Sequence, residues 1–243
     1  MNLPDDFSAE PSGSAVGRLW QLVFPSRCLR CGKRGVVVCK TCQPSISWLP
    51  AAVCPRCVVR TVDGRLCDRC ARQTAAGGPP LSSVRAACAY EGLVRTALQR
   101  LKFRQARFLA SFAAELIWAS LSSRPLQVDV LVPVPLHPSR HQKRGFNQSE
   151  LIARALADRL QVAVTTETLA RTRDTPPQVG LTSQERRRNL VDAFSCPGGS
   201  AAGLRVALVD DIMTTGSTLE ACAKPLIEAG AARVIALVVA RDL

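Results

Sequence analysis

The chain has 243 residues, and 32 Lys and Arg residues against 19 Asp and Glu residues give it a formal net charge of +13. A hydrophobic content of 47% excludes an intrinsically disordered chain. The longest apolar run near the end, residues 234–240, is too short for a membrane span, and the acidic N-terminus lacks the basic start of a secretory signal. We therefore expect a cytoplasmic protein without a membrane span, whose positive charge favours anionic partners.

Changes in composition along the chain predict three regions. Residues 1–26 form a polar tail and a short amphipathic helix at 15–24, which Pro25 ends. Residues 27–73 are rich in cysteine, and residues 83–243 alternate between strand and helix patterns. The stretch 73–80 is rich in Ala, Gly and Pro and predicts a linker.

The cysteine-rich region contains four Cys-x-x-Cys pairs: Cys28 and Cys31, Cys39 and Cys42, Cys54 and Cys57, and Cys67 and Cys70. Two residues between thiolates let one tight turn supply two corners of a tetrahedron. Four pairs therefore predict two structural zinc sites, neither with the open position that a catalytic zinc needs. Disulfides do not suit a cytoplasmic protein, and redox dithiols rarely occur in fours.

Two pairings of the cysteines satisfy this spacing. Sequential sites would join residues 28, 31, 39 and 42 and residues 54, 57, 67 and 70, whereas an interleaved cross-brace would use the same residues in another order. The region also holds ten basic residues, which suit a nucleic-acid contact or offset the thiolate charge. Its use is therefore either a rigid interaction platform or a nucleic-acid contact.

The third region predicts an α/β domain with a parallel sheet. Strands are expected at 84–90, 128–134, 162–165, 204–212 and 233–239. Helices are expected at 92–103, 151–160 and 217–229, and a further helix follows the first of these and ends at about residue 121. Strands that alternate with helices place ligand sites at the carboxyl ends of the strands.

A basic loop is expected after the strand at 128–134. Its candidate binding residues are Pro135, Leu136, His137, Arg140, Lys143 and Arg144. Asn147 and Glu150 have the spacing of a capping box at the start of the next helix. The basic side chains predict an anion site here, although a solvated basic loop is the alternative.

A second basic segment lies at residues 178–189. Thr182 and Glu185 have the spacing of another capping box, so Arg186 and Arg187 fall in the first turns of a helix. Cations are unfavourable there unless an anion or an acid lies nearby. The segment is therefore either a ligand-binding loop or a plain surface helix.

Residues 206–218 are the most informative segment. An apolar run leads into Asp210 and Asp211, and a small polar turn follows, with Thr214, Thr215, Gly216, Ser217 and Thr218. The strand places two carboxylates where they can accept hydrogen bonds from vicinal hydroxyls. The turn presents backbone N–H groups at a helix N-terminus, where a phosphate is favoured. This order predicts a sugar-phosphate site.

This segment resembles the phosphoribosyl-pyrophosphate (PRPP) loop of type I phosphoribosyltransferases. The resemblance implies that Asp210 and Asp211 bind the ribose hydroxyls and that residues 214–218 bind the 5-phosphate. It implies pyrophosphate binding, together with Mg²⁺, for the basic loop at 135–144. It also implies a mobile lid between strands, for which Arg186 and Arg187 are candidates.

The whole chain from about residue 18 onward resembles the ComF family of competence-associated proteins. The four Cys pairs, the triplet Leu101, Lys102 and Phe103, and residues 132–135, 144–148, 186–189 and 206–218 carry this resemblance. It implies a double zinc module before a phosphoribosyltransferase-like domain. It also implies PRPP or single-stranded DNA as ligand, and a competence helicase or another uptake protein as partner.

Two functions from different classes follow. The first is a phosphoribosyltransferase that uses PRPP and Mg²⁺ and an acceptor that the sequence does not identify. The second is a non-catalytic accessory protein of natural transformation that binds single-stranded DNA. Asp210 and Asp211 favour the enzyme because two acids do not suit a DNA-backbone contact, and so does an aromatic content of 5%. The basic surface and the zinc module favour the DNA-binding function.

The hood that covers the acceptor is expected on the N-terminal side. The sequence continues for only four residues after the last predicted strand, 233–239. We therefore expect the zinc module to supply the hood.

Overall fold

The structure is a computed structural model that describes residues 26–75, 80–121, 126–174, 185, 188–197 and 200–242. The helix predicted at 15–24 lies outside the described residues, as do Thr182 and the lid candidates Arg186 and Arg187.

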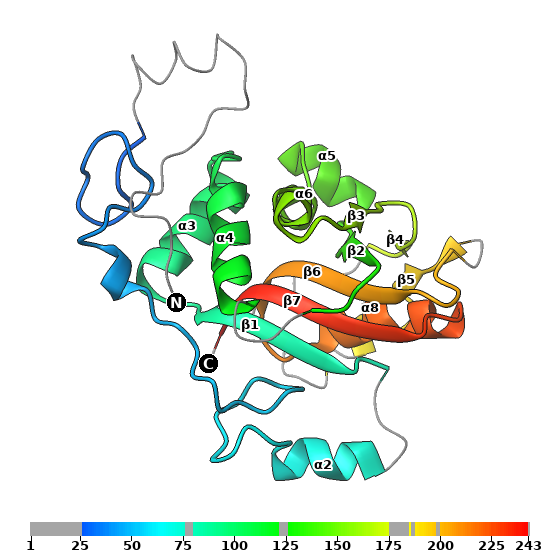
Figure 1. The fold of residues 1–243 in the computed structure, drawn as a ribbon. Helices are drawn as coiled ribbons and strands as arrows, with labels where there is room; N and C mark the ends of the chain where they lie inside the picture. Colours follow the sequence, from blue (N-terminus) through cyan, green and yellow to red (C-terminus); the bar gives the residue numbers. More distant parts are fainter. Residues whose placement is uncertain are drawn as a thin grey trace.

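A five-stranded parallel sheet lies at the centre of the fold, in the order β1-β7-β6-β2-β3 (Figure 1). Its strands are β1 (Ser83–Ala89), β2 (Val130–Pro133), β3 (Ala163–Val164), β6 (Arg205–Met213) and β7 (Arg233–Arg241). The central strands β6 and β7 are buried along most of their length, which explains their nearly continuous apolar sequences. The predicted parallel α/β sheet is confirmed.

Helices cover both faces of this sheet (Figure 1). The helices α3 (Gly92–Phe103), α4 (Leu109–Leu121) and α6 (Gln148–Leu160) pack on one face, and α8 (Ser217–Glu228) packs on the other. The antiparallel pair β4 (Ala170–Arg171) and β5 (Phe194–Ser195) packs on the α8 side. Within the described part of the chain, no helix has the length and apolar character needed to cross a membrane.

The segment expected to be a basic loop after β2 contains a short helix, α5 (Pro138–Arg144). The side chain of His137 caps it by accepting a hydrogen bond from the backbone N–H of Ser139. Pro138 suits the first helical position because its missing N–H would have no partner there. The capping box predicted at the start of α6 is only partly formed. The Asn147 side chain accepts from the N–H of Ser149, but Oε1 of Glu150 pairs with Arg154 instead of closing a capping box.

The cysteine-rich region forms two units on opposite sides of the sheet edge. The first zinc unit (residues 26–46) contains the 3₁₀ helix η1 (Gln43–Ser45) and packs with α3 and α4. The second zinc unit (residues 50–75) contains α2 (Asp68–Ala75), which extends into the stretch predicted as a linker, and it packs on the α8 side.

Residues 47–49 join the two zinc units along the outer edge of β1. The N–H of Leu49 donates to the carbonyl of Ala87 at 3.0 Å, and the N–H of Ala89 donates to that of Ser47 at 2.8 Å. Trp48 and Cys88 form an isolated antiparallel bridge. The connection therefore covers an edge strand that would otherwise expose unpaired backbone groups.

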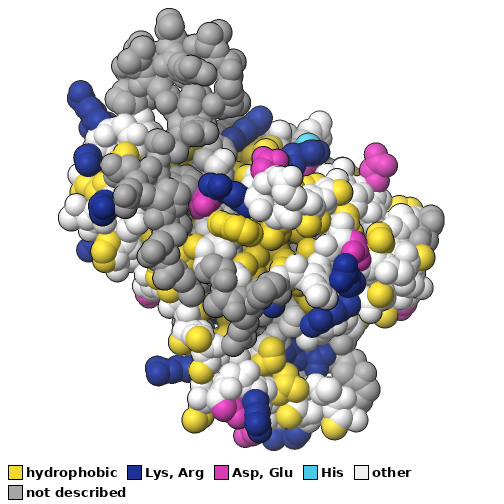
Figure 2. Space-filling model, viewed as in Figure 1, with side chains coloured by type: hydrophobic (Ala, Val, Ile, Leu, Met, Phe, Trp, Pro, Cys, Tyr) yellow, Lys and Arg dark blue, Asp and Glu magenta, His cyan; other side chains and the backbone are white. Residues whose placement is uncertain are grey.

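Charged side chains are distributed over the surface. Figure 2 shows Lys and Arg on several parts of the visible face, and the second zinc unit at the bottom of the view carries both basic and acidic side chains. The positive net charge is thus not concentrated in one patch on this face.

Candidate functional site

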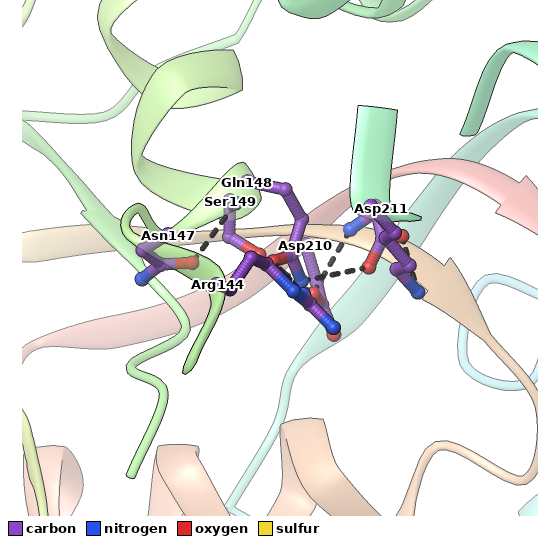
Figure 3. Close-up of polar contacts among 7 residues, drawn as sticks. Arg144, Asn147, Gln148, Ser149, Asp210 and Asp211 are labelled. Atoms are coloured by element: carbon purple, nitrogen blue, oxygen red, sulfur yellow. Dashed lines mark hydrogen bonds and ion pairs between the residues drawn. The ribbon is translucent and has the colours of Figure 1, made fainter. Parts of the chain in front are cut away.

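Asp210 and Asp211 lie toward the carboxyl end of β6, where α6 and α3 approach the sheet (Figure 3). Asp211 is buried, and Asp210 is half-buried. The Ser149 hydroxyl donates to Oδ1 of Asp210 at 2.9 Å, and the backbone N–H of Asp211 donates to the same oxygen at 2.9 Å. Both contacts are to Oδ1, so Oδ2 of Asp210 takes part in neither of them.

Each oxygen of Asp211 contacts a side chain from a different helix. Nε2 of Gln148, in α6, donates to Oδ1 at 3.4 Å, and Nζ of Lys102, in α3, lies 2.5 Å from Oδ2. Arg144, at the end of α5, donates to Oε1 of Gln148 at 2.5 Å. One polar network thus joins three helices to the acids on β6 (Figure 3).

Burial and the neighbouring charges determine protonation in this network. Burial raises the pKa of Asp210 to about 7, and the charge of Asp211 acts in the same direction against Lys102 and Ser149. Burial alone would lower the pKa of Lys102, but the carboxylate of Asp211 holds it above its usual value. The site therefore holds a buried ion pair between Lys102 and Asp211 beside an aspartate whose pKa is raised.

The β6–α8 turn (residues 214–218) begins at the end of the same strand. Gly216 is the N-cap of α8 and has a φ of +83°. The backbone conformation favours glycine, and a Cβ atom at this position would also lie 2.9 Å from Cε of Met213 and displace the end of that side chain. Oγ1 of Thr215 accepts a long, 3.4 Å hydrogen bond from the N–H of Ser217 and lies 2.9 Å from its hydroxyl. Hydroxyls therefore gather at the positive end of α8.

The basic residues predicted after β2 have different surroundings. Arg144 contacts the acid network through Gln148, whereas Lys143 is exposed and Arg140 is half-buried. His137 instead lies 3.4 Å from Oδ2 of Asp174. Its role in the structure is therefore to cap α5 beside an acid.

The loop between β2 and α5 faces a cavity of about 500 Å³. Pro135 and Leu136 line it together with His141 of α5 and Asn147 and Glu150 at the start of α6. The predicted anion-binding loop thus borders a space large enough for a small ligand.

The eight cysteines of the zinc units form two clusters of four in chain order. In each cluster, all four Sγ atoms lie within 4.8 Å of one another. The sulfur atoms of Cys28 and Cys39, Cys31 and Cys39, and Cys57 and Cys67 are separated by 3.8, 3.6 and 3.7 Å. A tetrahedral zinc with Zn–S bonds of about 2.3 Å needs sulfurs about 3.8 Å apart. The geometry fits two structural zinc sites and selects the sequential pairing.

Sequence reasoning gave no role to Lys102, Gln148 or Ser149. Lys102 and Gln148 lie in segments that carried the family resemblance, and Ser149 directly follows one of them, but their spacing alone does not show which acid they contact. A basic residue near the end of a helix, such as Lys102, normally indicates a favourable charge at the helix C-terminus. Only the packing of α3 against the sheet brings it to Asp211.

These features define the class of protein: a double zinc ribbon joined to a parallel-sheet domain of the phosphoribosyltransferase type. Residues 143–243 match the family model of the phosphoribosyl transferase domain, and residues 19–79 match that of the double zinc ribbon domain. Lys102 lies outside both matched segments.

Relatives with similar lengths identify the family. The DNA utilization protein YhgH of Salmonella typhimurium is 34% identical over 203 residues, which cover 81% of this chain and 87% of that protein. Competence protein F of Haemophilus influenzae is 30% identical over 221 residues, covering 85% and 93%. Competence protein ComFC of Bacillus subtilis is 28% identical over 208 residues, covering 80% of each. The chain belongs to the ComF family.

A more distant similarity is found among solved structures. The glutamine PRPP amidotransferase from B. subtilis aligns with a TM-score of 0.37 and 24% identity, over 54% of this chain and 26% of its own. The present chain thus spans about a quarter of that protein.

Proposed function

We propose that this protein binds PRPP with Mg²⁺ and transfers its phosphoribosyl group to an acceptor, in connection with DNA uptake. The observation that carries the proposal is the position of Asp210 and the β6–α8 turn on one strand end, next to two cations. The acid would accept from a ribose hydroxyl, and the turn would bind the 5-phosphate. The name of one relative, the DNA utilization protein YhgH, supports the connection with DNA.

The two acids have different proposed roles. Asp210 keeps Oδ2 for a ribose hydroxyl, whereas both oxygens of Asp211 already contact Lys102 or Gln148. Asp211 is only 3% exposed, so it would reach a ribose hydroxyl only after the side chains around it move. We therefore assign ribose binding first to Asp210, with Asp211 and Lys102 holding the strand end in place.

In the proposed reaction, the bond between ribose C1 and the pyrophosphate oxygen breaks, and its electron pair leaves with pyrophosphate. The acceptor forms the new bond to C1 and loses a proton. Such a reaction needs mainly positioning and stabilisation of the departing charge. Arg144, close to the acid network, is the proposed pyrophosphate contact.

Mg²⁺ bound with PRPP would offset the charge of the pyrophosphate group. This ion usually keeps several waters and binds through substrate phosphates and one or two carboxylates. Asp210 would serve as such a carboxylate because it is half-buried at the strand end and the contacts of Ser149 and the Asp211 N–H are to its other oxygen, Oδ1. The protein therefore need not supply a closed set of acidic ligands.

Isothermal titration of PRPP with Mg²⁺ into the zinc-loaded protein tests the proposal. Asp210→Asn should weaken binding at least tenfold, because it replaces a charged acceptor by a neutral amide. Asp158→Asn, which changes an exposed acid of α6, is the matched control and should leave binding unchanged. Absence of PRPP binding by the unaltered protein would contradict the proposal.

The second candidate function, binding of single-stranded DNA, has one observation in its favour. Phe103 at the end of α3 is 73% exposed, and Phe108 in the following loop is 46% exposed. The guanidinium of Arg144 lies 5.7 Å from the centre of the Phe103 ring, and Arg104 and Arg107 are exposed nearby. Exposed aromatic rings among cations suit stacking of unpaired bases.

Fluorescence anisotropy with a labelled single-stranded oligonucleotide tests this second function. Phe103→Ala should weaken binding several-fold by removing a stacking surface. Trp118→Ala, at a 39% exposed aromatic residue of α4, is the control and should have no effect. Equal effects of both substitutions would argue against the Phe103 surface.

A further inference from the structure

A cavity of about 510 Å³ separates the second zinc unit from the β6–α8 turn. Thr214, Thr215 and Gly216 line one side of it, and Arg69 and Gln73 of α2 line the other. The volume falls within the range of small-molecule sites. The turn proposed to bind phosphate therefore faces side chains of the second zinc unit across this cavity.

Hydrogen bonds hold the second zinc unit in place against the turn. Arg241, at the end of β7, donates from Nε to the carbonyl of Cys57 at 3.3 Å. The same side chain donates from Nη1 to the carbonyls of Met213, at 3.3 Å, and Thr214. A single guanidinium thus joins a zinc ligand of the second unit to the end of β6.

A second set of contacts fixes the zinc unit to the sheet. The N–H of Val84 in β1 donates to the carbonyl of Pro55 at 2.7 Å. Arg56 donates to the hydroxyl of Thr74 at 2.7 Å and to the carbonyl of Leu81 at 3.4 Å. The bonds of Pro55 and Arg56 thus connect the start of the second zinc unit to β1 and Leu81, and the bond to Thr74 connects Arg56 to the end of α2.

Helical spacing places the relevant side chains of α2 on one face. Arg69 and Gln73 are four residues apart and line the cavity together with the zinc ligand Cys70. Arg72, on the same helix, is exposed and is not among the residues that line the cavity. The orientation of this face depends on the second zinc site, because Cys67 and Cys70 flank the start of α2.

The charges around the cavity favour recognition by direct hydrogen bonds over attraction by net charge. Glu220 and Asp242 also line it, and they balance part of the positive charge of Arg56, Arg69 and Arg241. A phosphate monoester would meet N–H groups and hydroxyls from the turn and a guanidinium from α2. Guanidinium groups match phosphate oxygens in geometry as well as in charge.

We infer that the second zinc ribbon forms the other half of the phosphate site. In this arrangement Arg69 and Gln73 bind the 5-phosphate of a phosphoribosyl ligand from the side opposite the β6–α8 turn. The inference rests on the proposed function, since it assigns the same turn to the 5-phosphate. It makes the second zinc unit a part of the ligand site.

Titration of ribose 5-phosphate into the zinc-loaded full chain tests the inference. Arg69→Gln should weaken binding about tenfold or more, because it removes a charged donor from the phosphate. Arg72→Gln is the matched control on the same helix and should change the affinity less than twofold. Zinc content measured on both variants checks that the zinc ribbon remains intact.

Inorganic pyrophosphate serves as a second probe, because it lacks a 5-phosphate. Arg69→Gln should weaken the binding of ribose 5-phosphate and leave the binding of pyrophosphate unchanged. If the unaltered protein binds ribose 5-phosphate and Arg69→Gln binds it equally well, the inference is wrong and the proposed function stands. If the unaltered protein binds neither ribose 5-phosphate nor PRPP, both are wrong.

Discussion

Lys102 forms an ion pair with Asp211 at the candidate site. Lys102 comes from α3, which precedes the segment matched to the phosphoribosyl transferase domain, yet its Nζ lies 2.5 Å from a buried carboxylate oxygen. The side chain of Lys102 is only 19% exposed, so its charge is compensated mainly by this acid. The ion pair thus connects α3 to the strand end that carries the site.

Lys102→Met should lower the free energy of unfolding by about 3 kcal/mol, because it leaves the buried carboxylate of Asp211 unpaired. Urea denaturation measures the effect, with Arg104→Met at an exposed position as control. Adding Asp211→Asn to Lys102→Met should recover part of the loss. Equal stability of Lys102→Met and the unaltered protein would show that the ion pair contributes nothing.

Asp210 gives the protein a predictable pH dependence. Its pKa rises from 3.8 to about 7 on folding, mainly through burial. The folded state therefore binds more protons between these values, so stability falls as pH rises through this window. Asp210→Asn should remove this slope and should be more stable than the unaltered protein at pH 8. Thermal unfolding of both proteins at pH 5 and pH 8 measures this pH dependence. An unchanged dependence in the variant would contradict its assignment to Asp210.

The elements with long apolar patterns were predictable from the sequence. The observed α3, β6 and β7 lie within about two residues of their predicted ranges at each end, because buried parallel strands and amphipathic helices have regular patterns. The helix α5 was not predicted, because its seven residues are mostly polar and have no apolar period. The pair β4 and β5 was also missed, since each strand has two residues and depends on a distant partner.

The candidate site was only partly predictable for a similar reason. The acids and the β6–α8 turn are adjacent in sequence, so one segment indicated them. Lys102 and Gln148 reach Asp211 from positions 109 and 63 residues away in the chain, and no local pattern encodes such contacts. The zinc pairing was ambiguous because equal Cys-x-x-Cys spacing fits both arrangements.

The conformation of the β6–α8 turn depends on Gly216. Gly216→Ala should cost about 1 kcal/mol, because alanine is strained at a φ of +83°. It should also weaken PRPP binding, because alanine disfavours the left-handed backbone conformation with which Gly216 forms the turn. Gly203→Ala is a matched control, since Gly203 has a φ of +72° and nothing within 4 Å of the added carbon.

Both glycine variants should therefore lose similar stability, measured by urea denaturation. Only Gly216→Ala should also lose affinity for PRPP, measured by titration. Loss of affinity in both variants would mean that general destabilisation, and not the shape of the turn, controls binding.

In the whole molecule, the two zinc units cover different parts of one domain. The first packs against α3 and α4, and the second packs on the α8 side next to the β6–α8 turn. The prediction that the zinc module covers the ligand site therefore applies to the second unit and stays a proposal.

Zinc removal should test how much of the fold depends on these units. We expect two zinc ions per chain by elemental analysis, one for each Cys cluster. Removal by a strong chelator should lower the melting temperature, because metal binding contributes directly to the folding of such small units. Readdition of zinc should restore the melting temperature. A protein with intact stability after complete zinc loss would contradict structural roles for both sites.

The measurement that tests the central claim most directly is a crystal structure of the zinc-loaded protein with PRPP and Mg²⁺. We predict that the 5-phosphate contacts residues 214–218 and that a ribose hydroxyl donates to Asp210. We also predict that Arg69 of the second zinc unit contacts the same phosphate. PRPP bound elsewhere on the molecule, with the β6–α8 turn unoccupied, would contradict this account.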